Sequence, residues 1–527
     1  MKNGDWRLEI KKSPIPNRQS LTSNRYTPMS KPFLLGIDQG TSGSKAVILD
    51  REGQVHGYAY RPLDRLYPQP NWVEQDPDAV ARGVSTAVTE AIGKAGIRPD
   101  EIAACGLTSQ RNTEFVWDKR DGRSLANAIT WQDLRVQPIL DAFKRWPLAA
   151  EATYRLGYPP GSYMAALHLA WRMKNQTAVI EAAHNHHLHL GLSTAWLIRA
   201  LGRPSAHLMD SSLVQATGLY DFRQQSYWPE WLEWLGVPSD ALPTAVPTIH
   251  DFGSLHVTAP NGQSADIPVL AMIADQQAAL FGHGCRTPGA AECTHGTASY
   301  VKVFLGQQAA EQDNINVYYA WNLDGRQTYC LEAPTTVTGA AIRWLRDNAR
   351  LIDSYEHLSE LAADVPDTGG MTVVPAFTGL DVPYNDARAR ATFFGMALGH
   401  DRRHIARAFL ESIGYQIRTI LETITNEAGV QVAQLLVGGG VSASDLACQI
   451  QADLLGIPVL RPTFAETTAW AAGLLSGLGA GFWDNPDALP SLPGSHTLFE
   501  PTMQASVRDE GYGRWLRAIE LVRAWDS

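Results

Sequence analysis

The fold is decided by the stretch Leu34-Leu35-Gly36-Ile37-Asp38-Gln39-Gly40-Thr41-Ser42-Gly43-Ser44-Lys45-Ala46-Val47-Ile48-Leu49-Asp50. Two apolar runs flank a tight turn of glycines and hydroxyl residues, a pattern that predicts a β-hairpin over residues 33–49. Gly40 and Gly43 can adopt positive φ, so backbone N–H groups of the turn can converge on phosphate oxygens. Asp38 is placed to hold Mg²⁺ through water. A solvated turn is the alternative interpretation, because Asp, Gly and Ser are ordinary turn residues.

The length and charge of the chain restrict its class. At 527 residues it exceeds a single core, which stops growing near about 250–300 residues, so two large domains are expected. A hydrophobic content of 45% is enough to fill sizeable cores. The net charge of −10 leaves no basic face for a nucleic acid or a membrane surface. A small-molecule ligand fits this composition better.

Three features bear on the compartment. The five cysteines are odd in number and lack CxxC spacing, which fits neither a disulfide framework nor a zinc site, so we expect a cytoplasmic protein. The apolar run Trp470–Trp483 spans 14 residues, too short to cross a bilayer, and is expected to be a buried helix. Residues 1–31 lack the apolar segment of a secretory signal, and a disordered extension is expected there.

Alternating elements predict an α/β protein. Asp76 and Pro77 are a typical cap and first residue of a helix, and strand-like and helical patterns alternate from there to about residue 280. A second Gly-Thr turn, at Gly296 and Thr297, leads into another apolar strand. Two such hairpins indicate a duplicated architecture in which each half offers a phosphate-binding turn to a shared cleft. Chance is the alternative, because Gly-Thr turns are common.

A glycine turn near the C-terminus allows two interpretations. A buried strand is followed by three glycines at 438–440 and by a helix that begins near Ser444. An adenine or ribose could rest on this turn, or the glycines could serve tight packing. The turn also satisfies GxGxx[GA], which keeps a dinucleotide site open as an alternative. The next strand, however, runs into Arg461 and Pro462, where a ribose-binding acid is needed.

Two polar residues follow buried strands. Asp275 ends the apolar run 267–274, at the edge where α/β sheets place ligands, and could accept the proton of an attacking hydroxyl. The alternative is a simple helix cap. Arg111 follows the run 102–107 and could donate two hydrogen bonds to a polyol, although a structural salt bridge is the commoner use of arginine.

Taken in order, seven segments of the chain resemble the FGGY carbohydrate kinases, and the glycerol kinases among them most closely, over nearly all of residues 32–485. The matching segments lie at 36–41, 72–77, 109–111, 127–132, 274–282, 375–380 and 466–469. The resemblance implies a two-domain, actin-like fold of duplicated ribonuclease-H type, with an N-terminal domain at 32–282 and a C-terminal domain at 283–527. It also implies that ATP and a small polyol or sugar meet in the interdomain cleft, where a hydroxyl is phosphorylated.

The resemblance assigns roles to individual positions. Asp275 matches the general base and Asp38 the residue that organises Mg²⁺. The matches to polyol contacts or pocket walls are Arg111, Asn112, Trp131, Tyr163, Asp275, Gln276 and Tyr300. The matches to nucleotide contacts are Thr41, Ser42, Gly43, Lys45, Thr297, Gly339, Arg343, Gly440 and Ser444.

The chain departs from the glycerol kinase pattern at several of these positions. Asn112 stands where those enzymes carry Glu, so a charged acceptor becomes a neutral amide and another short polyol or a ketose becomes an alternative substrate. On the nucleotide side, Gly438 replaces an Asp, Ser444 an Asn and Ala298 a Gly. A non-catalytic regulator and an NAD-dependent oxidoreductase are therefore kept as alternatives of other classes. A homo-oligomer is possible.

Overall fold

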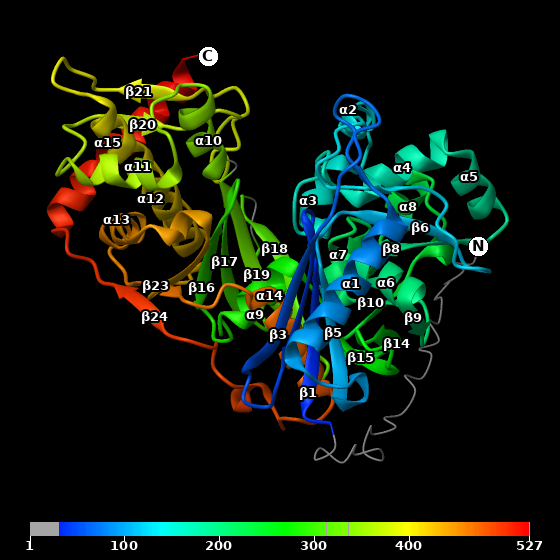
Figure 1. Ribbon diagram of the computed structural model, residues 1–527. Helices are drawn as coiled ribbons and strands as arrows, with labels where there is room; N and C mark the ends of the chain where they lie inside the picture. The colour runs from blue at the N-terminus through cyan, green and yellow to red at the C-terminus, as the bar shows by residue number, and fades with distance from the viewer. Residues whose placement is uncertain (1–30, 312–313, 336, 526–527) are drawn as a thin grey trace, which may run out of the picture.

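The computed structural model describes residues 31–311, 314–335 and 337–525, and residues 1–30 of the predicted extension lie outside this part. Figure 1 shows two lobes, each built around a β-sheet. The N-terminal sheet has seven strands, in the order β3 (Val55–Pro62), β2 (Gly43–Leu49), β1 (Phe33–Gln39), β5 (Ile102–Ser109), β15 (Ser264–Ala274), β14 (Ile249–Thr258) and β9 (Gly202–Pro204). The predicted hairpin is confirmed as β1 and β2.

Strand direction brings three predicted site segments to one edge of this sheet. β1 pairs antiparallel with β2 and parallel with β5, and β5 pairs parallel with β15. Asp38 lies opposite Thr108 on β5, and Thr108 lies opposite Ile273 on β15. The carboxyl ends of β1, β5 and β15 therefore lie side by side, which places Asp38, Arg111 and Asp275 at the same edge.

Helices cover both faces of the N-terminal sheet. α1 (Pro77–Ala95) begins as predicted, with the Asp76 side chain accepting from the backbone N–H of Asp78, and its apolar side packs on β2 and β3. Beside α1, α6 (Ser193–Leu201) packs on β9 and β14. The opposite face is covered by α14 (Thr467–Gly479), which contacts β1 and β5. The apolar run at 470–483 is thus a buried helix over most of its length, as expected.

The C-terminal sheet repeats the N-terminal order. Its strands are β18 (Asn316–Leu323), β19 (Arg326–Thr335), β17 (Ser299–Gly306), β16 (Ala291–His295), β22 (Leu435–Gly439), β23 (Val459–Pro462) and β24 (His496–Phe499). From β19 to β23 the pairings are antiparallel, antiparallel, parallel and parallel, as they are from β3 to β15. The duplication predicted from the two Gly-Thr turns is confirmed.

This sheet excludes the dinucleotide interpretation of the glycine turn. β22 does end in that turn, but it belongs to a mixed sheet with four antiparallel pairings among its described strands rather than to a doubly wound parallel sheet. The main helices of this lobe are α10 (Gly339–Asp347), α11 (Tyr355–Ala363), α12 (Arg402–Ala428), α13 (Asp445–Leu455) and α15 (Ala505–Ala524), with the small strands β20 (Thr372–Val374) and β21 (Thr392–Phe394).

Two helices lie between the sheets. α9 (Asp275–Gly282) contacts α14 and also β17 of the C-terminal sheet (Figure 1). Glycines allow the close approach: a Cβ at Gly36 would lie 1.9 Å from the carbonyl oxygen of Ala469, and one at Gly106 would lie 1.8 Å from that of Ala472. The two lobes therefore share this central layer.

The rest of the N-terminal lobe forms a cap beside the cleft. Its strands are β4 (Glu74–Gln75), β6 (Glu114–Asp118), β7 (Ala128–Ile129), β8 (Leu188–Leu192), β10 (Leu208–Asp210), β11 (Tyr220–Asp221), β12 (Ser226–Tyr227) and β13 (Thr244–Val246). Its helices are α2 (Gln137–Phe143), α3 (Ala152–Leu156), α4 (Ala165–Asn175), α5 (Thr177–His184), α7 (Ser211–Gln215) and α8 (Pro229–Leu235). None of the helices in the described ranges is both long and apolar enough to cross a membrane.

Candidate active site

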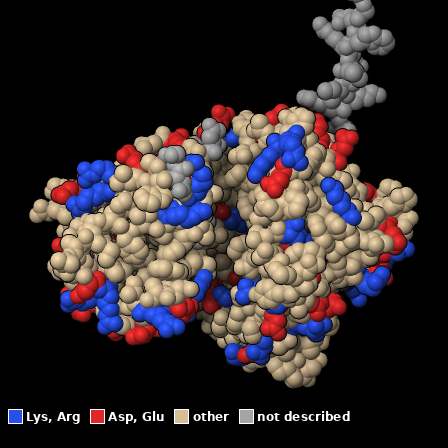
Figure 2. All heavy atoms as spheres, turned by 90° about the horizontal axis from the view of Figure 1, so that it is seen from above, with Lys and Arg blue, Asp and Glu red and all other residues tan. Residues whose placement is uncertain are grey.

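The two lobes enclose a hollow that contains charged side chains. Figure 2, seen from above, shows the surface hollowed between the lobes, with acidic and basic atoms inside. The predicted site residues lie in loops, at strand ends and at helix starts of both lobes.

Asp38, at the end of β1, is buried, and only one of its two carboxylate oxygens has a hydrogen-bond partner among the described residues. Its Oδ2 accepts a hydrogen bond from the Thr468 hydroxyl at 2.7 Å, whereas its Oδ1 is buried with no hydrogen-bond partner among the described residues. Burial raises the pKa of Asp38, and the Lys45 ammonium opposes this rise. An ionised carboxylate with one free oxygen in such a place calls for a cation. The side chain therefore fits a magnesium site.

Asp275 begins α9 directly after β15. Its Oδ1 accepts from the backbone N–H of Gln276 at 2.8 Å and lies 3.9 Å from Nε of Arg111. Burial raises the pKa of Asp275 to about 6, Arg111 lowers it, and the charge of Asp38 raises it further. The charge of Asp38 thus reaches Asp275, as expected for residues at neighbouring strand ends of one sheet edge. A carboxylate tuned in this way is suited to accept a proton near neutral pH.

Arg111 is bound by a residue of the other lobe. Its Nη2 donates to Oε1 and Oε2 of Glu332 on β19, at 2.7 and 2.8 Å, and its guanidinium lies 4.6 Å from the centre of the Tyr318 ring. Nη1 is buried without a hydrogen-bond partner among the described residues. The salt bridge that we gave as an alternative is therefore present, and Nη1 and Nε are the atoms left to serve a polyol.

Two side-chain amides border the same space. Asn112 is buried with φ of 60°, the left-handed region that Asn tolerates, and its Oδ1 accepts from the Ala165 N–H at 3.4 Å. Oε1 of Gln276 accepts from Nζ of Lys302 at 2.6 Å. Each amide thus has its oxygen engaged by a group that can only donate.

Three aromatic side chains complete the predicted pocket. Trp131 is 36% exposed, and its Nε1 donates to the Thr41 hydroxyl at 2.9 Å. The Tyr163 hydroxyl donates to the Pro159 carbonyl at 2.6 Å. Burial raises the pKa of Tyr300 to about 12, with contributions from Glu332, Arg111 and Asp275, so Tyr300 belongs to the same charged neighbourhood.

The β1–β2 turn differs in detail from expectation. Neither Gly40 nor Gly43 has a positive φ. Gly43 is needed instead for close packing, because a Cβ there would lie 2.3 Å from the Arg61 carbonyl oxygen. The Ser42 carbonyl accepts from the Tyr60 hydroxyl, and the Lys45 ammonium pairs with Glu466 at 2.7 Å. The turn is held by β3 on one side and by the start of α14 on the other.

The predicted nucleotide residues of the C-terminal lobe converge on the second turn. Both terminal nitrogens of Arg343 lie 3.3 Å from the Thr297 hydroxyl, and the Gly339 N–H donates to the Gly296 carbonyl at 3.1 Å. β22 runs beside β16, so that Gly439, with φ of 88°, pairs with His295 and leads directly to Gly440. These backbone turns form one surface at the end of the C-terminal sheet.

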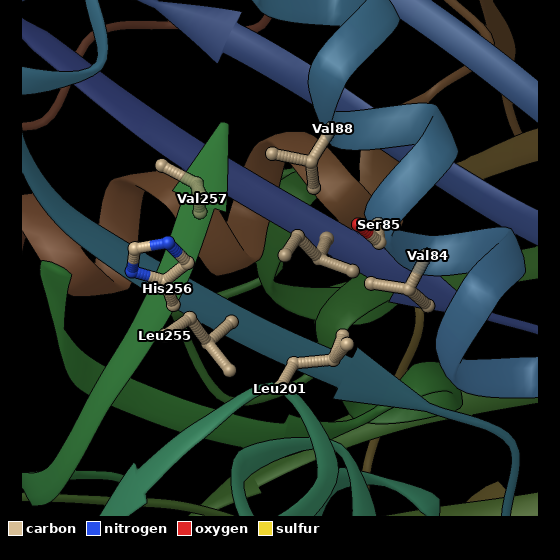
Figure 3. Close-up of a pocket in the computed structure, with 8 residues that line it drawn as sticks. Val84, Ser85, Val88, Leu201, Leu255, His256 and Val257 are labelled. Carbon is tan, nitrogen blue, oxygen red and sulfur yellow. The ribbon is translucent and has the colours of Figure 1, made fainter. Parts of the chain in front are cut away.

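Ser444 has a structural role of its own. Its hydroxyl oxygen caps α13 by accepting from the Ala447 N–H at 3.2 Å, and it also accepts from the Ser359 hydroxyl at 2.9 Å. The cap predicted from the sequence is confirmed, with Asp445 in the first turn. A separate pocket lies between α1 and β14, lined by Ile37, Val84, Ser85, Val88, Leu201, Leu255, His256 and Val257 (Figure 3). It is mainly apolar and includes none of the predicted site residues.

Sequence reasoning missed three charged residues of the cleft. Glu292, Lys302 and Glu332 are buried and lie on β16, β17 and β19. Each is a charge buried within a strand, as in Val301-Lys302-Val303, and an unpaired buried charge is costly. From this pattern the sequence could have predicted that each of these charged side chains has a partner of opposite charge.

Comparison with known proteins agrees with this geometry. The models of the FGGY family of carbohydrate kinases match residues 33–282 for the N-terminal domain and 291–479 for the C-terminal domain. The glycerol kinase of Carboxydothermus hydrogenoformans is 37% identical over 499 residues, covering 94% of this chain and 99% of its own. The crystal structure of Plasmodium falciparum glycerol kinase with ADP is 26% identical, with a TM-score of 0.86 over 93% of this chain and 98% of that one.

The chain belongs to the FGGY family of carbohydrate kinases. It is an ATP-dependent kinase that phosphorylates an alcohol group of a polyol or sugar. A structure of a xylulose kinase from Brucella ovis, 25% identical, also superposes with a TM-score of 0.82 over 94% of this chain and all of that one.

Proposed function

We propose that the enzyme transfers the terminal phosphoryl group of ATP to a hydroxyl of a short polyol or ketose, with glycerol as the first candidate. One observation carries the proposal. Asp275, with a pKa near 6, lies beside Arg111 and in the same crevice as Asp38. This is the arrangement needed for a base on one side of a transferred phosphoryl group and a metal-organising acid on the other.

In this mechanism Asp275 accepts the proton of the attacking hydroxyl as the bond to phosphorus forms. Arg111, Asn112 and Gln276 bind the remaining oxygens of the substrate and orient that hydroxyl. Trp131 and Tyr300 exclude water from the pocket. Most of the catalysis comes from positioning and charge neutralisation, because phosphoryl transfer requires little covalent chemistry from the protein.

On the nucleotide side, the two Gly-Thr turns and Lys45 bind the phosphates, and Gly339, Arg343, Gly440 and Ser444 border the rest of the nucleotide. Asp38 would hold Mg²⁺ through water, since its Oδ1 is buried and has no hydrogen-bond partner among the described residues. When bound, the ion neutralises charge on the phosphates. Thr468 fixes the orientation of Asp38 from the other oxygen.

The choice of substrate depends on two observations, the names of the relatives and the identity of residue Asn112. Curated relatives at 37–38% identity carry the name glycerol kinase, which supports glycerol. Asn112 weakens that choice, because a neutral amide hydrogen-bonds a hydroxyl with about 1 kcal/mol, against about 1.5–3 kcal/mol for a charged partner. A three-carbon polyol and its ketone are therefore the substrates to compare first.

The location and assembly of the enzyme are further proposals. All five cysteines are free and buried thiols, which supports a reducing compartment such as the cytoplasm. Light scattering on the purified protein tests the possible homo-oligomer.

The experiment is a coupled ADP-release assay with MgATP and a panel of short polyols and ketoses. We expect ADP release that depends on one of them, and Asp275→Asn should fold with a melting temperature at least as high as that of the wild type yet lose at least about a thousandfold in kcat. Near-normal turnover by that variant would refute the role of Asp275 as base. A wild-type protein that binds ATP but phosphorylates none of the panel would favour the non-catalytic regulator.

A further inference from the structure

A row of buried charges crosses the C-terminal sheet beneath the substrate pocket. Glu292 pairs in register with Lys302, and Lys302 pairs in register with Glu332. Residues directly opposite on neighbouring strands point to the same face, so the three side chains lie in one row. Arg111 of the other lobe extends the row by its bond to Glu332. The charges alternate in sign along it.

Lys302 connects this row to Gln276 of the pocket. Its side chain is 1% exposed, its ammonium is ion-paired with Glu292, and it donates to Oε1 of Gln276 at 2.6 Å. Glu292 is held in turn by the Thr294 hydroxyl at 3.0 Å and lies 3.8 Å from Nδ1 of His283. Glu292 therefore holds the Lys302 ammonium in place, and the ammonium in turn holds the Gln276 amide.

This contact settles which end of the amide faces the substrate. An ammonium can only donate, so the atom that it contacts is Oε1, and Nε2 is the end left for the pocket. The same holds for Asn112, whose Oδ1 accepts from the Ala165 N–H. No hydrogen bond within the described ranges uses Nε2 of Gln276 or Nδ2 of Asn112. Both amides thus keep their NH2 ends, which can only donate, free of other partners.

We infer that Lys302 is a positioning residue that sets substrate specificity, by holding Gln276 so that the pocket offers donors to every substrate oxygen except the one that meets Asp275. The inference rests on the proposed function. A carbonyl oxygen, which needs donors alone, suits this pocket. A secondary hydroxyl places a proton where Arg111, Asn112 and Gln276 provide no acceptor, and an unpaired polar hydrogen is costly. The preferred substrate class is therefore a short ketose rather than the matching polyol.

The test compares dihydroxyacetone with glycerol, which differ at the central carbon, a carbonyl in the first and a secondary alcohol in the second. The readout is the ratio of kcat/KM for dihydroxyacetone to that for glycerol. In Lys302→Met combined with Glu292→Gln, which removes both buried charges, Gln276 is free to turn and offer its oxygen. We expect the ratio to fall about three- to tenfold, with the KM for ATP unchanged.

Three further variants separate positioning from stability. Lys302→Arg keeps a cationic donor and should retain the ratio within about twofold. Gln276→Glu replaces the amide by an acceptor at a partly exposed position, leaves Lys302 paired, and should lower the ratio even if the double variant does not fold. Arg172→Met breaks another buried ion pair, with Glu114 at 2.8 Å, and should lower the melting temperature without moving the ratio.

An unchanged ratio in the double variant and in Gln276→Glu would overturn the inference, as would an equal shift in Arg172→Met. Either result concerns substrate specificity alone and would not contradict the proposed kinase activity. If the wild-type protein releases ADP with neither compound, the proposed function on short polyols and ketoses fails first, and the inference fails with it.

Discussion

Arg111 and Glu332 join the two lobes across the substrate pocket, with one guanidinium nitrogen donating to both carboxylate oxygens. Both side chains are nearly buried, at 11% and 4% exposure. Each would be a costly isolated charge in that place, so the pair is stable only when the lobes are together. The position of Arg111 beside Asp275 therefore depends on the lobe opposite.

Replacing Glu332 tests this dependence. Glu332→Gln removes the charge but keeps the size, so Arg111 loses its fixed orientation, and we expect kcat/KM for the polyol or ketose to fall about 10- to 100-fold. Steady-state kinetics measure this. The control is Glu510→Gln, which breaks an exposed pair with Arg514 on α15 and should change neither activity nor stability. Equal activities of the two variants would contradict the prediction.

The raised pKa of Asp275 predicts two opposite dependences on pH. The base is active when ionised, so kcat/KM should rise about tenfold per pH unit up to about 6 and then level. The free energy of unfolding should change with pH in the opposite direction. The folded protein holds a proton on Asp275 between the ordinary value of 3.8 and about 6, so the free energy of unfolding should fall as pH rises through this window.

Activity profiles and urea titrations across roughly pH 4–8 check both slopes. Asp275→Asn cannot titrate, so its stability should lack the contribution that declines between pH 3.8 and about 6. A wild-type activity that is flat through this window would show that Asp275 is not the base.

Asn112 allows a direct change of substrate preference. Asn112→Glu introduces a charged acceptor, which should raise kcat/KM for glycerol relative to dihydroxyacetone about tenfold. The left-handed backbone at this position, with φ of 60°, suits Asn better than Glu and should cost about 1 kcal/mol of stability. Asn112→Gln has the same length without the charge. If both variants shift the preference equally, side-chain length rather than charge is responsible.

The contact between β1 and α14 predicts a strong effect on folding. Gly36→Ala places a Cβ 1.9 Å from the Ala469 carbonyl oxygen, so the helix must move away from the sheet. We expect a loss of at least about 3 kcal/mol in the free energy of unfolding, measured by urea denaturation. On α15, Gly513→Ala meets nothing within 4 Å and should instead stabilise the protein by up to about 1 kcal/mol. A small loss for Gly36→Ala would mean that the helix and sheet are loosely packed.

Local patterns in the sequence were sufficient for much of the fold. The β1–β2 hairpin, the capped start of α1 and the second Gly-Thr hairpin follow from turn chemistry and apolar periodicity, and all three are present. The positive φ expected at Gly40 and Gly43 is absent, because Gly43 is used for contact with β3. Turn glycines serve conformation or close packing, and only the neighbouring strand decides which.

The site was predictable where it depends on strand ends and not where it depends on contacts between lobes. Asp38, Arg111 and Asp275 each follow an apolar run, and the sheet brings them to one edge. The bond between Arg111 and Glu332 joins residues 221 positions apart, which no local pattern encodes. The charges within β16, β17 and β19 gave a signal, but their partners depend on the register of those strands.

Helix α14 also has a consequence for the order of folding during synthesis. The ribosome makes every strand of the N-terminal sheet before it makes Thr467–Gly479, the helix that covers one face of β1 and β5. A nascent chain that has just completed β15 therefore carries a bare apolar surface on its first lobe until nearly two hundred further residues emerge, a count that follows from the end of β15 at Ala274 and the start of α14 at Thr467. Chaperone binding during translation should concentrate in this interval, since exposed sheet surface is where aggregation begins.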